Sequence, residues 1–151
     1  MRQIGSPIEQ RNSGNGNPNV ILHFDRPLNR RQSALLDALP EFDSRTTVKK
    51  RDVNMRGLAA LTVHTGDEYA MFTRKGERLI IRGNAYMTNI SAKDAEELAR
   101  AGFRWSGHTH PGTGINVRTA SPGDIEVLKA FGQEYSLIYD AMGRFEVFRG
   151  D

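Results

Sequence analysis

The stretch "SGHTHPGTGINVRTASPGD", residues 106–124, connects a predicted strand to a predicted helix, and it holds most of the residues that suggest chemistry. It opens with His108 and His110, one residue apart, and runs through a loop rich in glycine. It ends on Ser121 and Asp124, at the S-x-x-D spacing of a helix N-terminal cap. Two interpretations compete: a metal site with its helper residues, or two surface histidines followed by an ordinary cap.

Strand alternation predicts that the two histidines lie together. Residues two apart in a strand project from one face, so a strand over residues 103–110 brings His108 and His110 side by side. Two neutral imidazoles suit Zn²⁺, and a catalytic zinc site adds a third protein ligand and keeps one position open for water. Asp124 can supply that ligand, because the loop 111–120 lets the chain fold back. The chain has no cysteine, so any metal must be held by His, Asp or Glu.

A water activated by zinc also needs a base and a partner for the oxyanion. Glu68, at the start of a predicted hairpin, is the candidate general base, and Glu77 ranks second because it lies in or beside the hairpin turn. Ser121 is the candidate oxyanion stabiliser, through its hydroxyl or the free N–H groups at the helix start. The structural alternative stays open: an isolated H-x-H is commonly two exposed histidines, and S-x-x-D is more often a cap. Asp124 can serve as cap and ligand together.

The pattern of apolar and turn residues predicts an α/β (α+β) domain with a mixed β-sheet flanked by helices. Helices are expected over residues 28–39, 55–64, 91–102 and 121–132, with Asn54 as N-cap of the second and Ser91 with Asp94 as a capping box for the third. Strands are expected at 20–24, at 46–48 as an edge strand, at 103–110, and in hairpins over 68–82 and 135–149.

The bulk composition fits one globular domain with its own core. The chain has 151 residues, of which 38% are hydrophobic and 26% charged. We expect no membrane span, because no run of 18 apolar residues occurs, and no signal peptide, because no apolar segment follows the N-terminus. The formal net charge of +3 is too small to indicate an acidic partner.

Residues 1–19 are rich in Gly, Asn, Ser and Pro and predict a flexible linker or arm. The domain is expected over residues 20–151, with its core at about 55–151. A linker of this kind commonly joins a domain to something upstream, so we expect the chain to be part of a longer protein.

Other conspicuous side chains receive structural roles. Trp105 is expected to pack in the core, opposite in phase to Ser106 and His108. His23 and His64 are expected to be surface or core histidines, and Arg104 and Arg118 to be solvated charges. The hairpin residues expected in the core are Tyr69, Met71, Leu79 and Ile81.

Taken together, these residues resemble the JAB/MPN metalloproteases with the JAMM motif. The family pattern is an upstream Glu, then H-x-H-P, a loop and S-x-x-D; here it reads Glu68, "HTHP" at 108–111 and "SPGD" at 121–124, within about residues 55–140. The loop of ten residues, 111 to 120, is longer than is usual in the family. The resemblance implies an MPN-type, cytidine-deaminase-like core that hydrolyses peptide or isopeptide bonds. It also implies zinc held by His108, His110 and Asp124, with Glu68 as general acid/base and Ser121 at the oxyanion.

A closer resemblance is to JAB-like domains at the C-termini of bacterial polymorphic toxins. It rests on the segments "TGDEYAMFTRKGERLIIRGN", "RWSGHTHPG" and "GQEYSLIYDAMGRFEVF". It implies a toxin or effector secreted or delivered into a target cell as the C-terminal part of a larger protein. The partners implied are a protein or peptide substrate and a cognate immunity protein.

Two other functions remain as alternatives. A metal-dependent nuclease is permitted by the basic composition but disfavoured, because aromatic and basic residues are not interleaved as in single-strand binding surfaces. A non-catalytic MPN-like binding module is disfavoured because the full set of candidate site residues is present.

Overall fold

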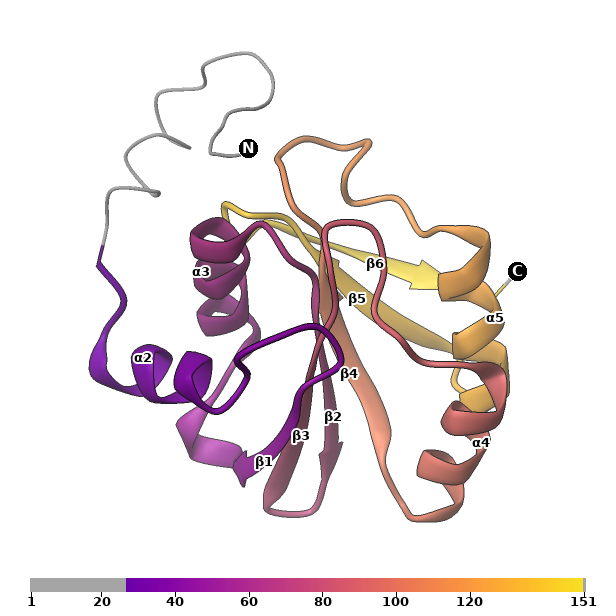
Figure 1. Cartoon of the computed structure of the whole chain (residues 1–151). Helices are drawn as coiled ribbons and strands as arrows, with labels where there is room; N and C mark the ends of the chain where they lie inside the picture. Colours follow the sequence, from indigo (N-terminus) through magenta and orange to yellow (C-terminus); the bar gives the residue numbers. More distant parts are fainter. Residues whose placement is uncertain (1–26, 151) are drawn as a thin grey trace.

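The computed structural model describes residues 27–150, which form three layers, with a six-stranded sheet between two pairs of helices (Figure 1). The strand order is β1-β3-β2-β4-β5-β6, so β1 and β6 are the edges. The pairing of β4 with β5 is parallel, and the other neighbouring strands are antiparallel. The predicted α/β (α+β) class, with a mixed sheet flanked by helices, is therefore confirmed.

The observed elements lie close to the predicted ranges. The strands are Arg45–Lys49 (β1), Tyr69–Arg74 (β2), Glu77–Arg82 (β3), Arg104–Thr109 (β4), Tyr135–Tyr139 (β5) and Phe145–Arg149 (β6). The helices are Arg30–Asp37 (α2), Met55–Thr65 (α3), Ala92–Arg100 (α4) and Pro122–Phe131 (α5), with a short 3-10 turn, Lys50–Asp52 (η1). The strand predicted at 20–24, with His23, lies outside the described residues. Within residues 27–150, no helix is long and apolar enough to cross a membrane.

Side-chain caps determine where the helices begin. Asn54 accepts a hydrogen bond from the Gly57 backbone at 2.8 Å, which satisfies an otherwise free N–H at the start of α3. Capping boxes of Ser91 with Asp94 and of Ser121 with Asp124 begin α4 and α5. All three caps match the sequence prediction, and they explain why the predicted helix starts were accurate.

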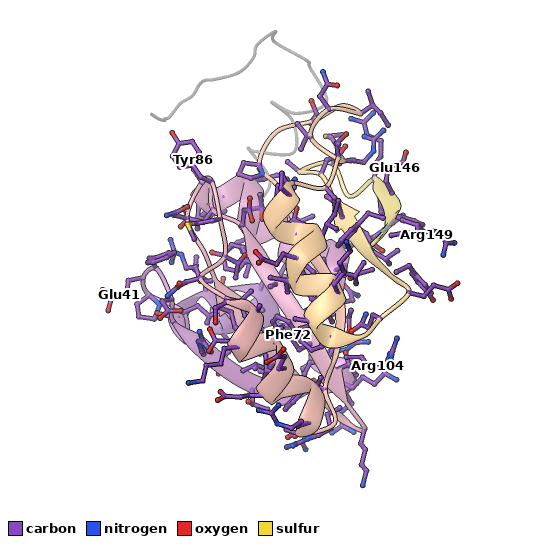
Figure 2. All side chains as sticks on the ribbon, turned by 90° about the vertical axis from the view of Figure 1, so that its right-hand side faces the viewer. Glu41, Phe72, Tyr86, Arg104, Glu146 and Arg149 are labelled. Carbon is purple, nitrogen blue, oxygen red and sulfur yellow. The ribbon has the colours of Figure 1, made fainter. Side chains whose placement is uncertain are left out.

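The two faces of the sheet are both covered, and each carries a separate core. One face packs against α2 and α3 and takes Tyr69, Met71 and Ile80 from the central hairpin. The other packs against α4 and α5 and takes Ala70 and Phe72 instead. Phe72 lies in the middle of that face, behind the two helices (Figure 2). Strand β2 is therefore buried on both sides, as expected for a central strand.

A β-bulge in β4 makes one prediction wrong. Trp105 is buried in the core, as expected, but it lies on the same face as His108, with ring centroids 4.8 Å apart. The register shows the cause: Gly107 pairs with Met71 and Trp105 with Phe72, so Ser106 is an extra residue between them. An extra residue shifts the alternation of side chains by one, which turns Trp105 to the face of His108.

The chain from β4 to β5 positions the candidate site. Strands β4 and β5 are parallel and joined through α5, so the start of α5 lies beside the carboxyl-terminal end of β4. In sheets with parallel strands, ligands commonly bind at the carboxyl ends of strands. The stretch 106–124 runs from β4 to α5 at the carboxyl end of β4.

Candidate metal centre

His108 and His110 meet at the carboxyl end of β4. Their Nε2 atoms lie 3.0 Å apart, as expected for residues two apart in an extended chain. His108 is the second-last residue of β4, and His110 continues the extended backbone by donating its N–H to Tyr139 of β5 at 2.9 Å. Thr109, between them, points the other way and hydrogen-bonds to Thr62 of α3.

Asp124 combines the two uses considered for it. One carboxylate oxygen, Oδ2, accepts the Ser121 backbone N–H at 2.9 Å and completes the capping box of α5. The same oxygen lies 3.5 Å from His110 Nε2, and Oδ1 lies 3.2 Å from His108 Nε2. The carboxylate therefore caps the helix and bridges both imidazoles.

Glu68, and not Glu77, is brought to the histidines. Glu68 immediately precedes β2, is 6% exposed, and places Oε2 3.7 Å from His110 Nε2. Glu77 begins β3 at the other end of the hairpin, where it pairs with Arg74. His64 lies exposed on α3, outside this group.

Two imidazoles and one carboxylate fit the donor set of a metal ion. Glu68, His108 and His110 each offer a ligand atom within 4.8 Å of the others. Around a tetrahedral zinc with bonds of 2.0–2.1 Å, neighbouring ligand atoms lie about 3.3 Å apart. The separations of 3.0, 3.2, 3.5 and 3.7 Å among the two Nε2 atoms and the two carboxylates bracket that value. Glu68, His108 and His110 can therefore reach one ion with small adjustments, and Asp124, which contacts both Nε2 atoms, lies outside this group of three.

Each imidazole is held with Nε2 toward the others. His110 Nδ1 lies 2.7 Å from the Val117 carbonyl, which can only accept, so Nδ1 donates, and in the neutral imidazole Nε2 then carries the lone pair that a metal needs. His108 is fixed by packing instead: its ring stacks on Trp105 and meets Phe148 edge-on. Its Nδ1 is buried without a hydrogen-bond partner among the described residues, so its polar contacts fall on Nε2.

Burial and mutual charge set the pKa values of the four groups. Burial raises the pKa of Glu68 to about 7, against the attraction of His110. Burial also favours a raised pKa for Asp124, but the charge and hydrogen bonds of the two histidines outweigh it and hold that pKa well below its usual range. Burial lowers the pKa of His108. Burial acts in the same direction on His110, but hydrogen bonding to Asp124 and the charge of Glu68 raise its pKa overall.

The loop 111–120 supplies a support that the sequence did not indicate. Its Val117 carbonyl orients His110, and the next residue, Arg118, forms a 2.7 Å ion pair with the fully buried Asp140 in the β5–β6 turn. The prediction that Arg118 is a solvated charge is therefore wrong, whereas Arg104 is exposed as predicted. Asp140 also accepts from Arg144 and from two backbone N–H groups, so its charge is well compensated. The ion pair fixes the loop next to the histidine.

A cleft of about 620 Å³ opens beside the four side chains. Ser121 lies at its margin, exposed, with Oγ accepting the Asp124 backbone N–H at 3.1 Å. The hydroxyl keeps its own proton to donate to a ligand in the cleft. Trp105 lines the same cleft while it packs in the core.

Comparison with known proteins gives no match: no family model, no curated protein and no solved structure is significantly similar to this chain. The chemistry of the site has to be inferred from its residues.

The raised pKa of Glu68 predicts a specific pH dependence of stability in metal-free protein. Folding raises the pKa of the Glu68 carboxyl from 4.5 to about 7. Between pH 4.5 and 7 the folded state therefore binds more protons than the unfolded state, and the free energy of unfolding falls as the pH rises through this range. Glu68→Gln removes this contribution. Urea unfolding in chelator from pH 4.5 to 8 should show the variant gaining roughly 3 kcal/mol relative to wild type. Parallel pH profiles would contradict the raised pKa.

The ion pair of Arg118 predicts an effect on metal affinity. Arg118→Met should release the Val117 carbonyl from His110 Nδ1 and weaken the binding of a metal ion by the candidate site about tenfold, the usual scale for the loss of an outer hydrogen bond. Arg144→Met is the matched control, because it removes another partner of Asp140 outside the loop. Competition with a chromophoric chelator measures both. Equal losses in the two variants would mean that the loop does not position His110.

Proposed function

We propose that this chain is a zinc-dependent metallopeptidase or isopeptidase that uses a metal-activated water. The observation that carries the proposal is the convergence of two imidazole Nε2 atoms and two carboxylates at the edge of a cleft. The resemblance to the JAMM pattern supports the same reaction, because the residues that it marks are the ones that meet in space.

The donor set favours zinc. Two imidazoles and one carboxylate, with a further position for water, are a common ligand set of catalytic zinc, and the chain has no thiolate to offer. In this proposal His108, His110 and Asp124 hold the ion. A bound zinc ion would supply a Lewis acid and would lower the pKa of water at the site.

Glu68 is proposed as the general acid/base. Its Oε2 would take the proton of the attacking water and pass it to the leaving nitrogen. Its position suits this task because both backbone polar groups of Glu68 are hydrogen-bonded. The Glu68 N–H donates to the Asn84 carbonyl, and the Glu68 carbonyl accepts from the Gly83 N–H. A general base held in this way needs little rearrangement before reaction.

Ser121 is proposed to stabilise the oxyanion that develops on the scissile carbonyl. Its Oγ accepts one hydrogen bond from the Asp124 N–H and keeps the hydroxyl proton to donate. Its position at the N-terminus of α5 adds the positive end of the helix dipole.

The charge of the cleft favours a peptide over a nucleic acid. The charged side chains that line it, besides the histidines, are Glu68, Asp124 and Glu126, and no Lys or Arg is among its lining residues. A nucleic acid would find no Lys or Arg in the cleft to pair with the phosphates on either side of the one at the metal ion, whereas a neutral peptide needs none. The nuclease therefore remains the weaker alternative. The non-catalytic MPN-like module is also weaker, because it gives no reason for burying these four groups together.

The resemblance to the JAB-like domains of polymorphic toxins extends the proposal to biology. We propose that the chain acts as the toxin or effector domain of a secreted bacterial polymorphic toxin. It would be delivered into a target cell and restrained in the producer by an immunity protein. The support is the segment-level similarity alone, and growth of target cells that express wild type or an inactive variant tests it.

The biochemical test combines metal content with hydrolysis. Purified protein should bind about one equivalent of zinc and hydrolyse unfolded casein or an isopeptide-linked dipeptide, and His108→Ala should lose both properties. Glu68→Gln should keep zinc and lose about 10²- to 10⁴-fold in rate, as expected for removal of a general base.

Glu77→Gln is the matched control and should leave the rate unchanged, since Glu77 pairs with Arg74 away from the site. Undiminished hydrolysis in Glu68→Gln would remove Glu68 from the mechanism. Degradation of DNA or RNA, lost in Asp124→Ala, would replace the peptidase proposal by the nuclease.

A further inference from the structure

The cleft has an apolar interior next to the candidate metal centre. Its floor includes Ala70 of β2, Trp105 of β4 and Val127 of α5, all buried in the core of that face. Ile90, before α4, adds an aliphatic wall. A cleft of about 620 Å³ has room for a large side chain, and an apolar lining favours burial of an apolar one.

Two large apolar side chains stand at the margin of this cleft. Tyr86 is 90% and Met87 50% exposed, and both belong to its lining. Tyr86 projects away from the body of the molecule (Figure 2). Single exposed apolar residues are common on protein surfaces, but two adjacent ones beside an apolar cleft are typical of a binding surface.

The turn that presents these side chains is built for one conformation. Asn84 Oδ1 accepts the backbone N–H groups of Tyr86 and Met87 at 2.8 and 3.0 Å, and Asn84 N–H donates to the Met87 carbonyl. Gly83 has no room for a side chain, because an added Cβ would lie 2.1 Å from the Met87 carbonyl oxygen. A turn held in this way loses little entropy when it contacts a ligand.

The same turn is hydrogen-bonded to the candidate base. Glu68 N–H donates to Asn84 at 2.8 Å, and Gly83 N–H donates to Glu68 at 2.7 Å. Residues 83–87 and Glu68 therefore form one unit. A side chain seated against Met87 would be held at a fixed position relative to the Glu68 carboxylate.

We propose that the cleft is a specificity subsite that takes a bulky apolar side chain, such as Leu or Phe, next to the scissile bond of a peptide, with Met87 and Tyr86 as its outer wall. The inference rests on the proposed function and names its substrate class. Glu68, Asp124 and Glu126 at the cleft exclude an acidic residue from the same position.

The test uses one series of short peptides without tryptophan that differ at a single central position, which is Phe, Leu, Ala or Glu. Trp105 is the only tryptophan of the chain and lines the cleft, so its fluorescence reports occupancy. Titration of chelator-treated full chain measures binding without turnover, and internally quenched versions with zinc measure kcat/KM. Phe and Leu should exceed Ala by about tenfold or more in both measurements, with Glu the weakest.

Met87→Ala and Tyr86→Ala should each reduce this preference at least about threefold and leave zinc binding intact. Tyr135→Ala is the control, because Tyr135 is an exposed aromatic of β5 that does not line the cleft. Hydrolysis without preference among the peptides, or preference unchanged in both cleft variants, would overturn the subsite and leave the peptidase standing. Selective binding with no hydrolysis of any peptide would keep the cleft as a binding pocket for a bulky apolar side chain and would reject the peptidase.

Discussion

The arrangement of the site depends on the hydrogen bonds and contacts that the Asp124 carboxylate makes. This carboxylate accepts the Ser121 N–H and so fixes the first turn of α5, and it contacts the Nε2 atoms of His108 and His110 at the end of β4. One side chain therefore connects the start of a helix to the end of the strand before it. The loop 111–120 closes over that connection, and through Val117 it holds His110 in the rotamer and tautomer that a metal requires.

The bulge at Ser106 gives the site its apolar side. Without it, strict alternation would turn Trp105 toward α3, and His108 would lose the ring on which it stacks. With it, Trp105 packs under His108 and also lines the cleft. The two imidazoles are therefore held in different ways: His110 by a hydrogen bond to the Val117 carbonyl, and His108 by packing against Trp105.

Local signals made most of the fold predictable from sequence. The helix starts at Asn54, Ser91 and Ser121 depend on side chains within three residues of the cap, and the meeting of His108 with His110 follows from strand geometry alone. The contacts that were not predicted are tertiary. The phase of Trp105 depends on one extra residue in a pairing with β2, and the partner of Arg118 is 22 residues away in the sequence. No pattern within a single segment encodes either of them.

The chain contains its own comparison between a helix cap and a candidate metal ligand. Ser91 and Asp94 begin α4 with the same reciprocal hydrogen bonds, 3.0 and 3.1 Å, that Ser121 and Asp124 make at 2.9 and 3.1 Å in α5. The α4 cap needs no histidine, so capping alone does not explain why Asp124 contacts two imidazoles. The two histidines compensate the charge of Asp124, but burial and the charge of Asp124 raise the pKa of Glu68, so the Glu68 carboxylate is not fully compensated. The metal ion proposed for this site would supply the missing positive charge, which a helix cap does not require.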